Sequence, residues 1–283
     1  MATNFEHCAA LVREADRDRY LATLFAPAQH RDALFALYAF NVEIARVRDL
    51  AREPMPGEIR LQWWREVLSG LRGGEAAANP VAAALLAALT HYRLGSERLL
   101  ALIDAHGFDL YDEPMASATD LEIYGIKTQS VLFAMAAEIL GSKGAASEMV
   151  TLDAGIAYAI ASILQDFARH AARRQLYVPL DVLTRLGVNR EDIFAGQSSA
   201  GLLAALTDMR VLARKHLAPA QEKLKGAPSE TFPALLPAAL VAPALRRMEK
   251  KGYDPFTFEP APAWRRQWWL WRAARNPRRI FSA

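Results

Sequence analysis

The chain has 283 residues, of which 52% are hydrophobic, and a formal net charge of +3. This composition suffices for one large buried core, and the single cysteine excludes an intramolecular disulfide. No Gly-rich phosphate loop, nucleophile elbow or dinucleotide fingerprint occurs, and the six histidines stand singly, so nucleotide-dependent enzymes, α/β-hydrolases and zinc sites are not indicated. The small net charge and the lack of a known binding module argue against nucleic acid as a partner.

The predicted elements are all helices. Apolar residues recur with a helical period and glycines are few, which favours an all-α fold in one domain over residues 1–283. No run of 18 apolar residues stands out, so no membrane span is expected. Prolines at 233, 237 and 243 should kink or split the last of the long helices. In chain order, the predicted helices cover residues 8–25, 28–49, 57–71, 81–94, 96–105, 119–140, 147–173, 181–186, 190–194, 199–224 and 232–250.

Two of these helices carry motifs with chemical character. Residues 37–49 read Leu-Tyr-Ala-Phe-Asn-Val-Glu-Ile-Ala-Arg-Val-Arg-Asp, and residues 163–170 read Ile-Leu-Gln-Asp-Phe-Ala-Arg-His, with Leu-Tyr-Val-Pro at 176–179. Both resemble signatures of the squalene/phytoene synthase family, which joins two allylic diphosphates head to head. That family carries Tyr-Ala-Phe-Cys-Arg-x-x-Asp-Asp-x-x-Asp on one helix, and Asp-x-x-Glu-Asp followed by Tyr-Leu-Pro on another. Further blocks in the family's order are Tyr20 with Leu24 and Pro27, and residues 36–40, 63–65, 108–110, 121–124, 163–166 and 177–179.

The resemblance implies an isoprenoid-synthase-like helical bundle around a central cavity. It also implies which side chains line that cavity, and an isoprenoid lipid is a candidate occupant. The implied cavity residues are Tyr20, Tyr38, Phe40, Tyr124, Gln129, Gln165 and Tyr177.

The carboxylates that the family's chemistry needs are largely replaced. Matched position by position, acids belong at 45, 46 and 49 and at 166, 169 and 170, but only Asp49 and Asp166 are acidic. The family neutralises its diphosphate with magnesium ions held between the two helices, and Mg²⁺ prefers near-octahedral oxygen ligands. Two carboxylates could hold one ion at best, and Arg169 offers Asp166 a competing pair at i+3. We therefore expect no catalytic residue and no cofactor; the alternative is an active, Mg²⁺-dependent head-to-head prenyl diphosphate transferase with Asp49 and Asp166 as ligands.

The replacements are similar to one branch of the family. Residues 39–45, 127–130 and 253–256, the last followed by a Trp-rich end, resemble complex I (NADH:ubiquinone oxidoreductase) assembly factor 6 and its bacterial relatives. This implies a non-catalytic factor that binds a complex I subunit or assembly intermediate. We expect it in the bacterial cytoplasm, with peripheral attachment to the inner face of the cytoplasmic membrane left open.

The C-terminal segment, residues 254–283, is rich in tryptophan and arginine. From residue 262 onward it contains four tryptophans, six arginines and no acid. Trp264, Trp268 and Trp271 share one helix face by their spacing. Either this stripe packs on the core, or it contacts an anionic membrane surface or a partner together with Arg272, Arg275, Arg278 and Arg279.

Overall fold

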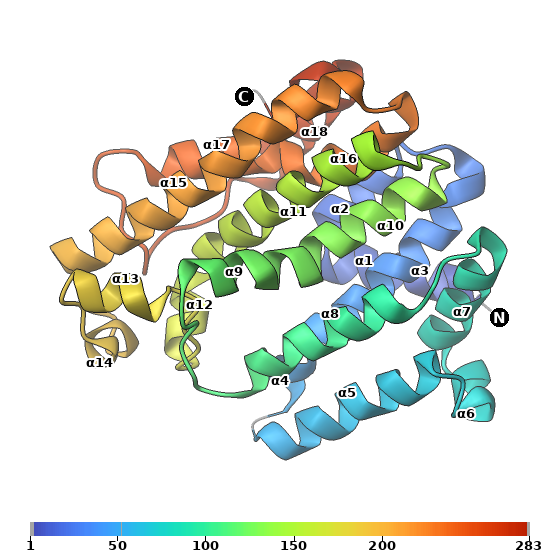
Figure 1. Ribbon diagram of the computed structural model, residues 1–283, viewed down its shortest axis with the longest axis horizontal. Helices are drawn as coiled ribbons and strands as arrows, with labels where there is room; N and C mark the ends of the chain where they lie inside the picture. Colours follow the sequence, from blue (N-terminus) through green and yellow to red (C-terminus); the bar gives the residue numbers. More distant parts are fainter. Residues whose placement is uncertain (1–2, 52, 282–283) are drawn as a thin grey trace.

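A computed structural model describes residues 3–51 and 53–281, and every regular element among them is a helix (Figure 1). The predicted all-α class is therefore confirmed. The first half contains α1 (Asn4–Ala15), α2 (Arg17–Thr23), α3 (Ala28–Ala45), α4 (Val47–Leu50), α5 (Pro54–Leu68), α6 (Gly73–Ala78), α7 (Pro80–Tyr92), α8 (Glu97–Gly107), η1 (Phe108–Leu110), α9 (Ala118–Gly125), η2 (Ile126–Ser130) and α10 (Val131–Ile139).

The second half is built on the long helix α11 and ends in a surface helix, α18. Its elements are α11 (Ala145–Gln165), α12 (Phe167–Ala172), α13 (Leu180–Arg185), α14 (Arg190–Phe194), α15 (Ala200–Lys223), η3 (Leu224–Gly226), η4 (Ser229–Thr231), α16 (Phe232–Leu235), η5 (Leu236–Leu240), α17 (Val241–Met248), α18 (Ala263–Arg275) and η6 (Pro277–Arg279).

Two hydrophobic clusters form the core. One surrounds α11, which packs against α15 and against the row formed by α9, η2 and α10; the other surrounds α3, which packs against α1 and α7 (Figure 1). Helix α10 joins them, because Phe133 belongs to the first cluster and Leu132 to the second. Among residues 3–51 and 53–281, α11 is the one helix that is long and apolar enough to cross a bilayer. The sequence alone predicts no membrane span. Most of that window is buried inside the protein, as in the central helix of a packed core.

Several helix boundaries differ from the prediction. The first predicted helix begins earlier, where Thr3 and Glu6 form a capping box, and it breaks at Asp16, whose carboxylate accepts a hydrogen bond from the Arg19 backbone N–H at 3.0 Å. Ser147, expected near a helix start, lies buried inside α11, which starts after Gly144 at φ +102°. The proline-rich segment is split as expected, into α16, η5 and α17.

The π-helical segment η2 packs against the middle of α11. It comprises Ile126–Ser130, and the Ser130 hydroxyl donates to the Leu152 carbonyl of α11 at 2.7 Å. Gly155 faces the backbone of Ser130 so closely that a Cβ atom would overlap it. This is a position where only glycine lets the two backbones approach.

An ionic cluster ties α9, α11 and α15 together at this level. Nδ1 of His216 lies 2.8 Å from an Asp153 oxygen and its Nε2 lies 2.9 Å from a Glu122 oxygen, while Lys223 donates to Asp153 at 2.6 Å. Hydrogen bonding to Asp153 raises the pKa of His216, although burial opposes it. Burial alone would raise the pKa of Asp153, but its bonds to His216 and Lys223 outweigh this and lower it.

Candidate functional site

Both motif helices break inside their motifs. The first ends at Ala45, and Asp49 lies on the separate short helix α4; the second ends at Gln165, and Asp166 stands between α11 and α12. Asp49 forms an ion pair with Arg173, which follows α12, and Asp166 accepts from Arg169 at 2.9 Å. Asp49 and Asp166 thus each have an arginine partner from the region of the second motif.

The residues at the motif positions do not fit a magnesium cluster. Among the described residues, no group of three or more His, Cys, Asp or Glu is placed to hold a metal. Of the other positions, Ala45 has no ligand atom, and Arg46 and Arg169 are cations. His170 is partly buried with its ring 4.8 Å from that of Tyr177, and burial lowers its pKa well below the ordinary value, so it is neutral at pH 7. These six motif positions, all within the described residues, do not offer the set of oxygen ligands that Mg²⁺ prefers.

An arginine fills the space between the two motif helices. Arg19 is 3% exposed, and its guanidinium lies 5.4 Å from the ring centre of Tyr38 on α3 and 5.0 Å from that of Tyr158 on α11. It donates to Asp16 at 2.8 Å and to Gln129 at 2.5 Å, and its Nε has no hydrogen-bond partner within residues 3–51 and 53–281. Burial raises the pKa of Tyr38 to about 12, so that hydroxyl stays protonated. Two of the expected cavity residues, Tyr38 and Gln129, therefore contact Arg19.

Tyr20 and Phe40 have aromatic neighbours on α3 and α5. Tyr20 stacks on Phe35 at 5.4 Å, and fully buried Phe40 meets the edge of Trp64 at 5.0 Å. Both side chains pack with the cluster around α3. The aromatic residues at these two positions therefore have a packing role in the core.

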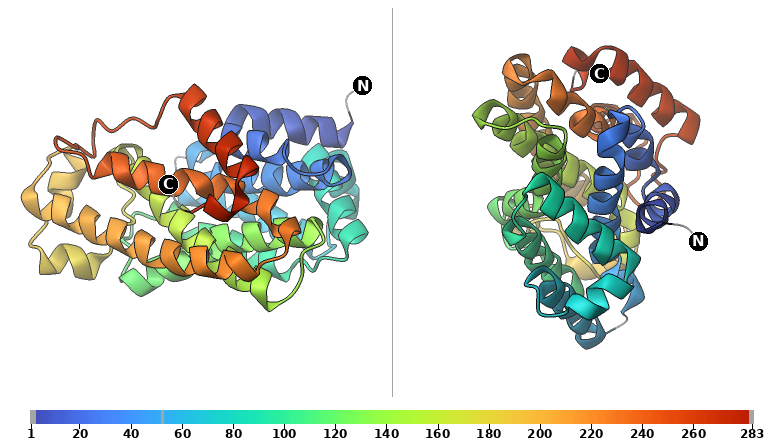
Figure 2. Two further views of the ribbon diagram at one scale, coloured as in Figure 1. Left: turned by 90° about the horizontal axis from the view of Figure 1, so that it is seen from above. Right: turned by 90° about the vertical axis from the view of Figure 1, so that its right-hand side faces the viewer.

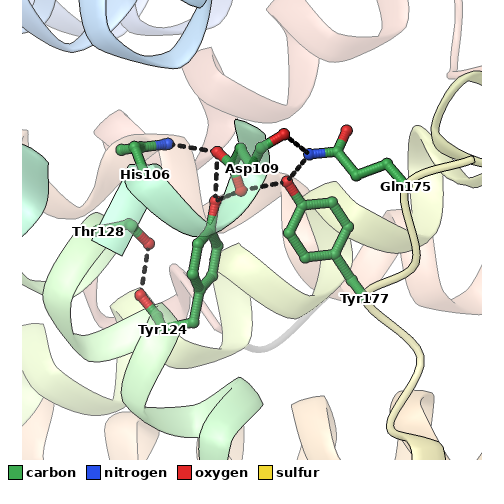
Figure 3. A network of polar contacts seen from close by, with 6 residues as sticks. All are labelled: His106, Asp109, Tyr124, Thr128, Gln175 and Tyr177. Atoms are coloured by element: carbon green, nitrogen blue, oxygen red, sulfur yellow. Dashed lines mark hydrogen bonds and ion pairs between the residues drawn. The ribbon is translucent and has the colours of Figure 1, made fainter. Parts of the chain in front are cut away.

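Tyr124 and Tyr177 belong to a buried network centred on Asp109 (Figure 3). Tyr177 donates to the Asp109 carboxylate at 2.5 Å and Tyr124 at 3.0 Å, while Nδ1 of His106 lies 2.6 Å from its second oxygen. Gln175 donates to the Asp109 backbone carbonyl at 3.2 Å and to the Tyr177 hydroxyl at 2.7 Å. Burial, together with the nearby carboxylate, raises the pKa of both tyrosines, so they remain donors.

This network draws together three blocks that carry the family resemblance. Asp109 comes from residues 108–110, Tyr124 from 121–124 and Tyr177 from 177–179. It clamps η1 to α9 and to the segment before α13. The three blocks therefore position the backbone.

A pocket of about 360 Å³ lies beside the end of α11, and its volume falls in the range of small-ligand sites. Gln165 is the one expected cavity residue that lines it, and Asp166 lies at its edge. Its apolar wall comes from α11, α17 and α18, with Tyr158, Ala244 and Trp269 among its members. Asp18 of α2 also lines the pocket and pairs with Arg266 of α18, so this helix closes one side of it.

Helix α18 places its tryptophans in two environments. Leu270 and Ala273 are buried and Trp269 packs against the core, whereas Trp264, Trp268 and Trp271 are 64%, 48% and 46% exposed. Packing of the Trp stripe on the core, one of the two interpretations of the sequence, is therefore wrong for these three side chains. Helix α18 itself lies at the periphery of the molecule (Figure 2).

Four arginines accompany the tryptophan stripe at the end of the chain. Arg272 and Arg275 lie on α18 and stack over Trp268 and Trp271, and Arg278 and Arg279 lie on η6. Gln221 of α15 donates to the Arg278 carbonyl at 2.8 Å and holds η6 in place. Residues 282–283 of the segment lie outside the described part.

Arg19 and Asp109 are the two central residues that the sequence did not single out as site candidates. Asp109 belongs to residues 108–110, one of the blocks that resemble the family, but the resemblance assigns it no role. Arg19 carries one visible signal, its place between Asp18 and Tyr20 at the start of a recognised block, and charge at a core-facing helical position is unusual.

Comparisons with known proteins agree with the resemblance. A family model described as squalene/phytoene synthase matches residues 12–272. NADH dehydrogenase (ubiquinone) complex I, assembly factor 6, of Rattus norvegicus is 31% identical over 250 residues, covering 88% of this chain and 75% of the rat protein. The 15-cis-phytoene synthase of Synechococcus elongatus is 22% identical over 276 residues, covering 93% of this chain and 89% of that enzyme.

A solved structure shares the fold. A dehydrosqualene synthase in complex with ligand superposes with a TM-score of 0.83 at 18% identity, covering 97% of this chain and 96% of that one. The predicted isoprenoid-synthase-like helical fold is thereby confirmed. So is the resemblance to both the synthases and the assembly factor 6 branch.

Proposed function

The chain belongs to the squalene/phytoene synthase family, and from this premise we propose that it is a non-catalytic binding factor in the assembly of respiratory complex I. Its partner would be a complex I subunit or assembly intermediate. It would act from the bacterial cytoplasm at the inner face of the cytoplasmic membrane. The relative named as assembly factor 6, similar over most of this chain, supports this choice.

One observation carries the proposal: the two remaining motif carboxylates are each paired with arginine. Asp49 contacts Arg173 and Asp166 contacts Arg169. The six motif positions hold two acids and two arginines, so their net charge is zero with His170 neutral. A departing diphosphate needs its growing negative charge neutralised by metal, and a divalent cation gains little at a site without net negative charge. We propose no cofactor for the same reason.

The runner-up is an active head-to-head prenyl diphosphate transferase. The pocket beside Gln165 and Asp166 favours it, because its apolar wall and charged edge suit an amphipathic ligand such as an isoprenoid lipid. Similarity to a phytoene synthase points the same way. Under this alternative, Asp49 and Asp166 would have to leave their arginines to bind Mg²⁺.

Product analysis separates the two functions. The purified chain is incubated with farnesyl or geranylgeranyl diphosphate, Mg²⁺ and NADPH, and we expect no squalene, hydroxysqualene or phytoene. Each 1.36 kcal/mol of lost transition-state stabilisation is about tenfold in rate, so the loss of several metal ligands should abolish turnover. Product that disappears on Asp49→Asn or Asp166→Asn would overturn the proposal.

Genetic rescue tests the assembly role itself. Deleting the gene should lower the amount of assembled complex I on native gels, and wild-type chain should restore it. The Asp166→Asn variant should restore it equally well, since binding does not need that carboxylate as a metal ligand. Unchanged complex I in the deletion strain, or failure of a normally expressed Asp166→Asn chain, would refute a non-catalytic assembly role.

A further inference from the structure

The exposed tryptophans of α18 are each accompanied by an arginine. Arg265 lies over the ring of Trp264 at 5.2 Å, Arg272 over Trp268 at 5.5 Å and Arg275 over Trp271 at 4.5 Å. Indole rings with stacked guanidinium groups present an apolar surface and positive charge from the same helix face. Such a face suits a boundary where hydrocarbon and anionic groups meet.

The face is held rigidly against the protein. Leu270 and Ala273 are buried on the opposite side of α18, and Arg266 pairs with Asp18 of α2. The outward direction of Trp264, Trp268 and Trp271 is thus fixed by the fold. A hollow bordered by Trp264, Arg265, Trp268 and Trp269 opens between the rings.

A basic groove adjoins this face. It measures about 210 Å³ and lies between α17, α18 and η6. Four guanidinium groups line it, no carboxylate does, and Pro243, Ala273 and Ile280 contribute apolar surface. Guanidinium groups bind phosphate oxygens through paired N–H donors, so several arginines around one hollow suit a phosphate group. The arginines are Arg246, Arg272, Arg275 and Arg279.

We propose that the outer face of α18 docks on an anionic phospholipid bilayer, with the indoles entering the interface and the arginine groove holding a lipid phosphate headgroup. Charge complementarity selects this occupant, because residues 262–283 contain six arginines and no acid. The indoles distinguish it from a soluble phosphate compound, which would gain nothing from them. The proposal goes beyond the assembly function, since vesicle binding requires no complex I.

The experiment uses the full chain and sedimentation with vesicles. Phosphatidylcholine vesicles are compared with vesicles that also contain phosphatidylglycerol, and tryptophan emission is recorded in each. We expect binding and a blue shift of the emission with the anionic vesicles. A wild-type chain that ignores phosphatidylglycerol would refute the proposal.

Two triple variants locate the surface. Arg272→Gln/Arg275→Gln/Arg279→Gln should weaken partitioning on the order of a hundredfold, because each basic residue near an anionic surface contributes about fivefold. The control Arg13→Gln/Arg60→Gln/Arg190→Gln removes the same charge from exposed positions elsewhere and should bind much as wild type does. Equal loss in both variants would show a net-charge effect and overturn the groove. Should the first variant fail to fold, Arg279→Gln alone should still lose about fivefold.

A further variant and a competitor separate lipid from phosphate. Trp264→Ala/Trp268→Ala/Trp271→Ala should lose most of its partitioning while its melting temperature stays near wild type, since these rings are exposed. If this variant binds the vesicles unchanged, the indoles do not enter the interface and the bilayer assignment fails. If inorganic phosphate at physiological salt removes all wild-type binding, the groove serves soluble phosphate and the assignment likewise fails.

Discussion

Replacing Arg19 by alanine should destabilise the protein by about 3 kcal/mol. Arg19 is 3% exposed, and its guanidinium donates to Asp16 and Gln129 and lies between the rings of Tyr38 and Tyr158. Removing one partner of a buried ion pair costs about 3–5 kcal/mol, because the other charge is left without compensation. The Asp16 side chain is 19% exposed and lines the pocket, so water can reach it, and the lower end of that range applies.

Differential scanning calorimetry gives the measurement. At about 2.1 cal/mol/K of unfolding entropy per residue, a chain of 283 residues changes by about 0.6 kcal/mol per degree, so 3 kcal/mol lowers the melting temperature by about 5 °C. Arg17→Ala is the matched control, since Arg17 lies two residues away and is exposed, and it should shift the melting temperature by less than about 1 °C. An Arg19→Ala transition within about 1 °C of wild type would refute the argument.

A methionine at the same position tests which part of the side chain matters. Arg19→Met fills most of the volume without the charge or the donors, so we expect nearly the loss seen with alanine. If Arg19→Met regains wild-type stability, the ion pair contributes little and the filled volume alone explains the effect.

Two further predictions concern the junction around α11. The raised pKa of His216 means that its contribution is fully present below the unfolded-state value of about 6.5 and is lost as pH rises through the folded-state value. His216→Gln should therefore lower the melting temperature more at about pH 6 than at about pH 9, and an equal deficit at both would contradict the charged pairing. Gly155→Ala should cost several kcal/mol in urea unfolding because its Cβ would overlap the Ser130 backbone, whereas Gly107→Ala, with open space around its Cβ, should cost nothing; equal stability of the two variants would show that the contact yields easily.

Local signals in the sequence were enough for the all-helical class and for several of the long helices, but not for every helix or boundary. Helical periodicity and proline positions gave the all-α class and the split at 232–250, and the i, i+4, i+7 spacing found the tryptophan face. The breaks at Arg46 and Asp166 carry no glycine or proline, so nothing in the local sequence marks them. Short-range sequence patterns therefore did not predict where these two helices end.

Contacts between residues far apart in the sequence could not be predicted from local patterns. Asp49 meets Arg173 from 124 positions away and Arg19 meets Gln129 from 110 positions away, so only the folded chain reveals either pair. The expected pairing of Asp166 with Arg169, by contrast, is a one-turn contact that helix spacing predicts. The sequence also left open whether the tryptophan face is buried or exposed. Periodicity predicts which side chains share a helix face, but not what that face contacts.

The position of Arg19 has a consequence for evolution within this family. Acids introduced at 45, 46, 169 and 170 would leave a buried guanidinium between α3 and α11, in contact with both Tyr38 and Tyr158. Replacing Arg19 before those acids are present is expected to lower stability without adding a metal ligand. Under the proposed non-catalytic function we therefore expect each of these changes to be neutral or harmful on its own, so that a complete synthase motif would require several coupled changes at once.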